Sequence, residues 1–157
     1  MRQPPEVPIT AEGLEEVKRE LDELINVKRP HIVAKIKAAR EHGDLSENFE
    51  YHAARNEQAF LETRIRELEA IVKNHVLIES NGPSDRVQLL STVTFQEDGA
   101  GEETYRIVGP AEADPAQGRI SFESELGKAL LGHRVGDEVV VRTPAGGSYT
   151  VRIVRIE

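Results

Sequence analysis

The chain has 157 residues with a formal net charge of -8, 31% charged residues, 4% aromatic residues and no cysteine. A chain of this length admits one or two small domains rather than a large enzyme. The lack of cysteine excludes disulfide frameworks, thiolate zinc sites and thiol nucleophiles. No run approaches 18 apolar residues, and the start MRQPPEVPIT lacks the apolar stretch of a signal peptide, so we expect a soluble, cytoplasmic protein with no membrane partner.

Residues 11–76 carry the apolar period of two long helices. Thr10 is a residue type that caps helix N-termini, and the apolar seam that follows it recovers after Pro30, so we expect this proline to bend the first helix rather than end it. The two seams have heptad-like spacing and consist of Leu14, Val17, Leu21, Leu24, Ile32, Ile36 and Ala39, and of Leu61, Ile65, Leu68, Val72 and Val76.

The segment EHGDLSEN at 41–48 interrupts both seams and predicts a short connection between the helices. Two helices joined in this way run antiparallel. With the turn near residue 45, the numbers of facing residues add to about 90, which places Leu14 near Val76 and Leu21 near Leu68. About 30 residues per helix at 1.5 Å each predict a finger roughly 45 Å long, with the connection at its tip.

The second half has the period of strands. ESNGPSDR at 79–86 has linker composition, and SELGKALLG at 124–132 predicts one short helix. Five β-branched runs of strand length lie at 87–95, 103–109, 118–123, 137–143 and 148–156, and PAGG joins the last two as a hairpin. We therefore expect an all-α N-terminal antiparallel coiled-coil hairpin over 1–79, and an α+β C-terminal domain over 80–157 with an antiparallel sheet and one short helix.

Charge is separated along the finger. Residues 24–40 contain five basic side chains and no acid, whereas residues 41–54 contain four acids and no lysine or arginine, so the tip at 41–50 is acidic. Such zones are common on solvated surfaces, where they pair across a hairpin. The alternative is that the finger inserts these acids into the interior of a partner.

Asp44 and Glu47 are the pair of acids at this tip with the most specific functional interpretation. Their spacing fits an approximate capping box, with Asp44 as N-cap of the second helix. It also fits two hard oxygen ligands for magnesium, which usually takes only one or two protein carboxylates. Both interpretations can hold together, but two carboxylates cannot enclose an ion, so further ligands would come from a partner. Lys35 and Arg55 are expected opposite each other, as a two-sided basic patch for phosphate contact.

These residues carry a resemblance to a known family. PITAEGLEEVKREL (8–21), AREHGDLSENFEYHAAR (39–55), RIRELEAIV (64–72), TYRIVGPAEADPAQGRIS (104–121) and GKALLGHRVGDEVVV (127–141) resemble the bacterial GreA/GreB transcript cleavage factors. The similarity covers nearly the whole chain and is closer to the GreA branch than to the GreB branch.

The resemblance implies a coiled-coil finger that enters the secondary channel of RNA polymerase, with an FKBP-like C-terminal domain docked at the channel rim. Asp44 and Glu47 would hold a magnesium ion shared with the polymerase active site and orient the attacking water, in a two-metal hydrolysis of a backtracked transcript. The isolated protein would bind no ion and would not itself be an enzyme. Arg40 and Arg55 match the family's basic patch, which contacts the 3' end of the RNA. One departure is Glu125, where relatives have proline, and it leaves the docking contacts unassigned.

Two other functions compete with transcript cleavage. The chain could be a non-cleaving secondary-channel regulator, similar to the anti-cleavage paralogues that occlude the channel with an acidic finger. It could also be an oligomerising coiled coil with no metal role, although we expect a monomer. Addition of the protein to a backtracked complex separates cleavage, which shortens the transcript, from occlusion, which only reduces nucleotide incorporation.

Overall fold

The computed structural model describes residues 5–41, 48–80, 82 and 84–157. They form two compact units, one over residues 14–74 and one that joins the described residues up to Gly13 to residues 75–157. This division differs from the boundary expected at 79/80. The reason is that strand β1 (Val7–Ile9) pairs in parallel with strand β2 (His75–Leu77), which ties the start of the chain to the region that follows the hairpin.

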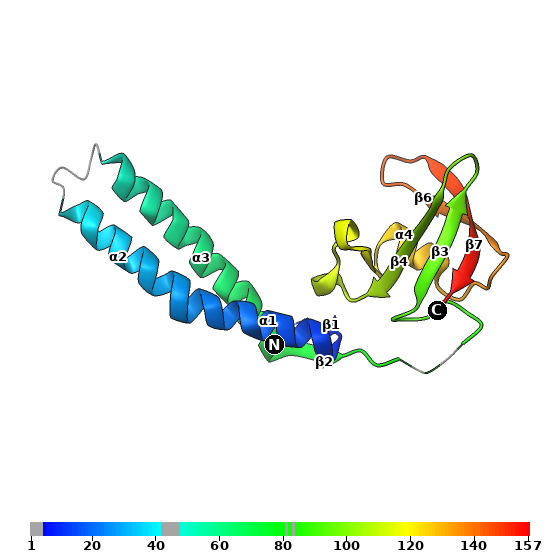
Figure 1. Ribbon diagram of the computed structural model, residues 1–157, viewed down its shortest axis with the longest axis horizontal. Coiled ribbons are helices and arrows are strands. Elements are labelled where there is room, and N and C mark those ends of the chain that lie inside the picture. Colours follow the sequence, from blue (N-terminus) through cyan, green and yellow to red (C-terminus); the bar gives the residue numbers. More distant parts are fainter. Residues whose placement is uncertain (1–4, 42–47, 81, 83) are drawn as a thin grey trace. The chain divides into compact units, whose positions relative to one another are not determined.

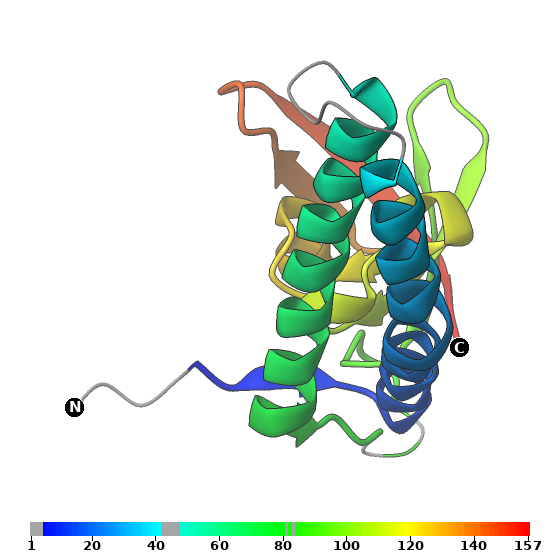
Figure 2. The same cartoon turned by 90° about the vertical axis from the view of Figure 1, so that its left-hand side faces the viewer.

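The first unit is a helical hairpin, referred to below as the arm. Helix α1 (Ala11–Glu23) continues through the π-helical segment η1 (Leu24–Lys28) into α2 (Arg29–Arg40), and α3 (Phe49–Asn74) runs beside them (Figures 1 and 2). Two ion pairs that cross the hairpin, Arg29 with Glu62 and Lys35 with Glu57, lie within two residues of the expected facing pairs, and Arg64 with Glu20 crosses it further from the turn. The antiparallel hairpin is therefore confirmed.

The seams supply the core of the arm. Leu21 and Val72 are only half-buried, and Val76 was wrongly expected in the second helix, because α3 ends at Asn74 and Val76 lies in β2 opposite Pro8. The buried apolar residues are Leu14, Val17, Leu24, Ile32, Ile36 and Ala39 from α1, η1 and α2, and Ala54, Leu61, Ile65 and Leu68 from α3.

As expected, the helix continues through Pro30. The chain accommodates the proline with a π-helical turn. The backbone N–H of Arg29 bonds to the carbonyl of Leu24, five residues earlier. Proline has no N–H to donate, and its ring clashes with the carbonyl four residues before it in an α-helix. A wider turn immediately before the proline relieves that clash while the seam continues.

The second unit contains a five-stranded sheet with the order β5-β4-β3-β7-β6. All five expected strands are present, but the sheet is mixed, because β4 and β5 pair in parallel, and so the expectation of a purely antiparallel sheet is wrong. The strands are β3 (Thr92–Glu97), β4 (Glu102–Val108), β5 (Arg119–Ser121), β6 (Glu138–Arg142) and β7 (Ser148–Ile156). The first strand begins at Thr92 rather than at Val87, because Leu90 has a φ of 72° and interrupts extended backbone.

One helix packs on this sheet as predicted. Helix α4 (Glu125–Leu130) is capped by Ser124, whose Oγ accepts the N–H of Gly127 at 3.0 Å. The acidic Glu125 stands in its first turn, where the helix dipole favours it. The core beneath consists of Val87, Val93, Phe95, Ile107, Ile120, Leu130, Val139, Val141, Val151 and Ile153.

Thr10, which follows β1, bonds to Glu112 within the same unit. Its backbone N–H donates to Glu112 Oε2 at 2.9 Å, its hydroxyl also bonds Glu112, and its Oγ1 accepts the N–H of Gly13. Thr10 therefore caps α1, as predicted. Gly109 permits a close approach between its backbone and that of Pro8 in β1, because a Cβ at position 109 would collide with the carbonyl of Pro8. None of the described helices is long and apolar enough to cross a membrane.

Candidate functional site

The two helices of the arm are joined at their outer end by the side chain of Asn48. Its Nδ2 donates to the carbonyl of Ala39 at 2.7 Å, and its Oδ1 accepts the backbone N–H of Tyr51 at 3.0 Å. The first contact reaches the last turn of α2 and the second caps the first turn of α3. Asn48 thus closes the arm immediately beyond the segment that carries the acidic pair.

Asp44 and Glu47 lie outside the described residues, which resume at Asn48. The expected cap of the second helix is corrected by the structure, because α3 begins at Phe49 and Asn48, not Asp44, caps it. The α2 side of the segment is also defined: the N–H of Glu41 bonds to the carbonyl of Ala38 at 3.2 Å.

The donor chemistry of the acidic pair suits magnesium, which prefers carboxylate oxygen and retains several waters. Among the described residues, no three histidine, cysteine, aspartate or glutamate side chains gather where they could hold a metal ion. The described part of the chain therefore offers no additional cluster to complete the coordination.

Arg40 and Arg55 line one groove beside the closed end of the arm. The guanidinium carbon of Arg40 lies 5.8 Å from the ring centroid of Tyr51, and Arg55 donates to the amide oxygen of Gln58 at 3.1 Å. Within the described part of the chain, neither arginine forms an ion pair with a carboxylate. The groove is lined by Val33, Ile36, Lys37, Arg40, Glu41, Arg55 and Gln58.

Lys35 is separated from these arginines. Its Nζ lies 3.2 Å and 3.3 Å from the two carboxylate oxygens of Glu57, and it lines a different groove, together with Glu50 and Ala53. The expected opposition of Lys35 and Arg55 is therefore not found, because Glu57 takes that place. The basic patch that remains unneutralised by described acids lies on the Arg40 and Arg55 side.

Further along the arm, Arg29 is also neutralised. Its Nη2 lies 2.8 Å from Glu62 Oε2, and hydrogen bonding and charge from Arg29 hold the pKa of Glu62 below its ordinary value. The same contact raises the pKa of Arg29. The interpretation of charge pairing across a solvated hairpin is correct for Arg29 and Lys35, while Arg40 and Arg55 differ from it.

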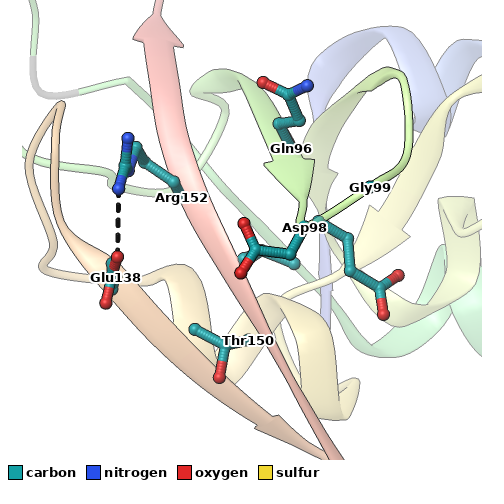
Figure 3. Close-up of a pocket in the computed structure, with 8 residues that line it drawn as sticks. Gln96, Asp98, Gly99, Glu138, Thr150 and Arg152 are labelled. Carbon is teal, nitrogen blue, oxygen red and sulfur yellow. Dashed lines mark hydrogen bonds and ion pairs between the residues drawn. The ribbon is translucent and has the colours of Figure 1, made fainter.

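A hollow in the sheet-bearing unit is also lined by acids (Figure 3). It is lined by Gln96, Glu97, Asp98 and Gly99 at the end of β3, and by Glu138 and Arg152. Arg152 Nη2 lies 3.1 Å from Glu138 Oε1, so one acid there is already paired. This hollow has no grouping of described side chains that could bind a metal ion.

Asn48 is the residue that sequence reasoning did not single out. The available signal was its type, since asparagine is favoured at helix N-caps, but aspartate is favoured there too, and Asp44 with Glu47 three residues later fitted an approximate capping box. Phe49 follows it with 87% of its surface exposed, the largest exposure among the large apolar side chains described.

Comparison with known proteins gives a consistent result over both units. The family model "Transcription elongation factor, N-terminal" of GreA and GreB matches residues 7–76, and the model "Transcription elongation factor, GreA/GreB, C-term" matches residues 82–157. The transcription elongation factor GreA of Macrococcus caseolyticus is 51% identical over 152 residues, and that of Staphylococcus epidermidis is 51% identical over 151 residues. Both alignments cover 96% of this chain and 96% of the relative.

Several solved structures are also similar to this chain. The crystal structure of GreA factor homolog 1 (Gfh1) of Thermus thermophilus is 31% identical, covers 98% of this chain and 99% of its own, and has a TM-score of 0.45.

Proposed function

The chain belongs to the GreA/GreB family of transcription elongation factors, and we propose that it stimulates the intrinsic transcript cleavage of bacterial RNA polymerase. In this proposal the arm enters the secondary channel of the polymerase, and the sheet-bearing unit docks at the channel rim. The factor acts as a monomer on complexes that have backtracked and stalled. The nuclease belongs to the polymerase, and this protein activates it.

One observation supports the proposal most directly. Arg40 and Arg55 line a single groove at the end of the arm that also carries Asp44 and Glu47 in its connecting segment. Guanidinium groups bind phosphate oxygens, and carboxylates bind hard cations. One end of the arm therefore carries both kinds of group that hydrolysis of a phosphodiester requires.

We assign the roles of the chain's own residues as follows. Asp44 and Glu47 would supply oxygen ligands for a magnesium ion shared with the polymerase active site, and would orient the attacking water by accepting its hydrogen bonds. Bound magnesium lowers the pKa of water and stabilises negative charge on the phosphate. The isolated protein is not proposed to bind the ion, because two carboxylates leave most of its coordination unfilled.

Arg40 and Arg55 would hold the 3' end of the backtracked RNA through its phosphates. Lys35 was expected to share this role, but its ion pair with Glu57 reduces the positive charge that it can offer to RNA. We therefore propose that the two arginines carry most of the contact and that Lys35 contributes less.

The proposal is tested with purified polymerase, magnesium and a stalled backtracked complex. We expect Asp44→Asn and Glu47→Gln each to reduce transcript cleavage on the order of 100-fold, with almost unchanged affinity for polymerase. Glu50→Gln is the matched control, because Glu50 stands exposed in the first turn of α3 at the same end of the arm. Equal cleavage by wild type, Asp44→Asn and Glu47→Gln would refute the proposal.

The same assay distinguishes transcript cleavage from the alternative, occlusion of the channel. A channel regulator without cleavage activity would slow nucleotide incorporation and leave the transcript at its original length. Shortened transcripts with the wild-type protein, and full-length transcripts with Asp44→Asn, support the cleavage factor.

A further inference from the structure

We propose that Arg86 and Arg134 form a docking surface for an acidic protein segment of the polymerase, an inference that rests on the proposed function. Both arginines belong to the sheet-bearing unit, which in that function docks at the channel rim. Both are exposed. The occupant is a stretch of protein with accessible carboxylates, not RNA.

The two arginines face each other across a short antiparallel pairing. Arg86 and Arg134 form a β-bridge outside the named strands. The neighbouring hydrogen bond, from the Val87 N–H to the His133 carbonyl at 2.8 Å, flanks this bridge. At such a position of an antiparallel pair the side chains lie on one face, with Cβ atoms about 4.5–5.5 Å apart. Like charges placed directly opposite each other destabilise the folded chain.

The backbone that carries the two arginines is fixed to the core. Val87 is 3% exposed and belongs to the hydrophobic core of the sheet-bearing unit. Its carbonyl accepts the N–H of Gly132 at 2.8 Å, in addition to the bond that its own N–H donates. The backbone therefore holds the arginines opposite each other, and relief of their repulsion has to come from negative charge nearby.

The chain's own carboxylates supply this charge only in part. Arg134 Nε lies 3.5 Å from Asp85 Oδ2, and the Asp85 side chain keeps 74% of its surface exposed, so water screens this contact. Within the part of the chain that the structure describes, Arg86 forms no ion pair with a carboxylate. Asp85 thus shows the chemistry that the pair accepts, and its weak contact leaves room for a carboxylate of a partner.

An exposed apolar residue stands beside the pair on a closed turn. The Arg134 carbonyl accepts the N–H of Asp137 at 3.1 Å, and Gly136 has a φ of 92°, which is typical of a type II turn. Asp137 Oδ2 accepts the backbone N–H of Arg134 at 2.9 Å, and this bond lowers the pKa of Asp137, so its carboxylate stays ionised and holds the turn. Val135, inside the turn, keeps 55% of its surface exposed.

This combination favours protein over nucleic acid as the occupant. Arginines beside an apolar contact are typical of protein interfaces. Residues 80–157 carry 12 acidic and 8 basic side chains, so the net charge of this half opposes a polyanion such as RNA. A single carboxylate on a protein surface can still approach the two arginines, because repulsion from distant charges is screened by salt.

The test measures binding to purified bacterial RNA polymerase core enzyme that carries no nucleic acid, by competition with labelled wild type. The variants are Arg86→Gln and Arg134→Gln, alone and together. Arg142→Gln is the matched control, since Arg142 is an exposed arginine at the far end of β6, about 13 Å along the strand from Glu138. Val135→Thr keeps the side-chain shape and is compared with Val140→Thr, because Val140 is 59% exposed in the same strand.

We expect each arginine variant to weaken binding about 5-fold and the double variant at least 10-fold, with smaller differences at high salt. Val135→Thr should weaken binding about 3-fold. The melting temperature should stay at or slightly above that of wild type, because the repulsion is relieved. Both controls should match wild type, and saturating amounts of the double variant should cleave backtracked complexes at the wild-type rate.

Asp85→Asn gives a prediction of opposite sign. It removes the carboxylate that competes for Arg134, so binding to the core enzyme should tighten about 2-fold. The gain should disappear when Asp85→Asn is combined with Arg134→Gln, because the two side chains act through one contact. A structural role of Asp85 alone would weaken binding or leave it unchanged, and either result would contradict this part of the inference.

Several outcomes would overturn the docking surface. They are wild-type affinity of the double variant, an equal loss in Arg142→Gln, a loss that accompanies a lower melting temperature, and failure of wild type to bind the core enzyme. A loss seen only with complexes that contain RNA would assign the arginines to phosphate instead. The two levels stay separable: normal cleavage by Asp44→Asn removes the proposed function, whereas normal binding by the double variant removes only the docking surface.

Discussion

Arg29 and Glu62 form a two-point contact between the helices of the arm, with Nε to Oε1 at 2.9 Å and Nη2 to Oε2 at 2.8 Å. The geometry is the paired fork that guanidinium and carboxylate groups favour. Both side chains keep about a third of their surface exposed, so solvent screens the pair and its contribution to stability is modest.

This contact predicts a pH-dependent stability. Because Arg29 lowers the pKa of Glu62 in the folded protein, the contribution is complete above the ordinary glutamate pKa of about 4.3, and is lost as pH falls through the lowered folded value. We expect Glu62→Gln to lower the melting temperature of the arm slightly at pH 7, with the gap to wild type closing at acidic pH. Circular dichroism melts at pH 7 and pH 3, with the exposed Glu15→Gln as control, measure this, and a gap that widens in acid would contradict it.

The seam of the arm predicts a much larger effect. Leu68 is 1% exposed, and its replacement by alanine should cost about 2–5 kcal/mol of unfolding free energy through lost burial and a cavity. Phe60→Ala on the same helix is the control, since Phe60 is 78% exposed and its truncation should change stability by less than about 0.5 kcal/mol. Urea unfolding followed by helical signal compares them, and equal losses would show that the assigned core is wrong.

The arginine groove predicts a salt dependence. If Arg40 and Arg55 each neutralise one phosphate of single-stranded RNA, then Arg40→Gln and Arg55→Gln should each reduce the slope of log affinity against log salt by about 0.7. The measurement is binding to backtracked complexes across a salt series. Lys35→Gln is the matched control, because Glu57 already pairs with this lysine, and it should leave the slope nearly unchanged. A larger change for Lys35→Gln than for Arg55→Gln would place the RNA on the other groove.

The fold was largely predictable where the pattern was periodic. The helical seams and the five strand runs each extend over several residues, so their apolar spacing identifies them. The pair of β1 and β2 was not predictable, because each strand has three residues and its partner lies more than sixty positions away. The π-helical turn before Pro30 was also missed, since seam spacing reports that a helix continues but not how its hydrogen bonds rearrange.

The candidate site was predictable in its charges but not in its contacts. The positions of charged residues in the sequence locate the basic segment at 24–40 and the acidic tip at 41–50, and the family resemblance selects Arg40 and Arg55. Neither reveals that Glu57 faces Lys35, because a shift of two residues on a helix moves a side chain by about 200° around the axis. Asn48 escaped notice for a related reason: its cross-helix partner is a backbone carbonyl, which has no sequence signature.

The contact between Thr10 and Glu112 predicts a stability loss in the sheet-bearing unit. Thr10 is 3% exposed, and both its N–H and its hydroxyl bond the carboxylate of Glu112. Glu112→Ala would leave the buried N–H without this partner, at a cost of about 1–3 kcal/mol. Glu123→Ala, an exposed acid of the same unit, should change stability by less than about 0.5 kcal/mol.

Hydrogen exchange distinguishes a local effect from a general one. In Glu112→Ala the Thr10 amide should lose protection, whereas amides in the sheet core, such as that of Phe95, should change only by the overall loss of stability. The Gly13 amide reports on the cap, because it donates to Thr10 Oγ1 at 3.0 Å. If Glu112 orients the Thr10 hydroxyl, the Gly13 amide should lose protection together with the Thr10 amide. Unchanged exchange at Thr10 would show that the carboxylate does not hold the start of α1, and the cap would then depend on the threonine alone.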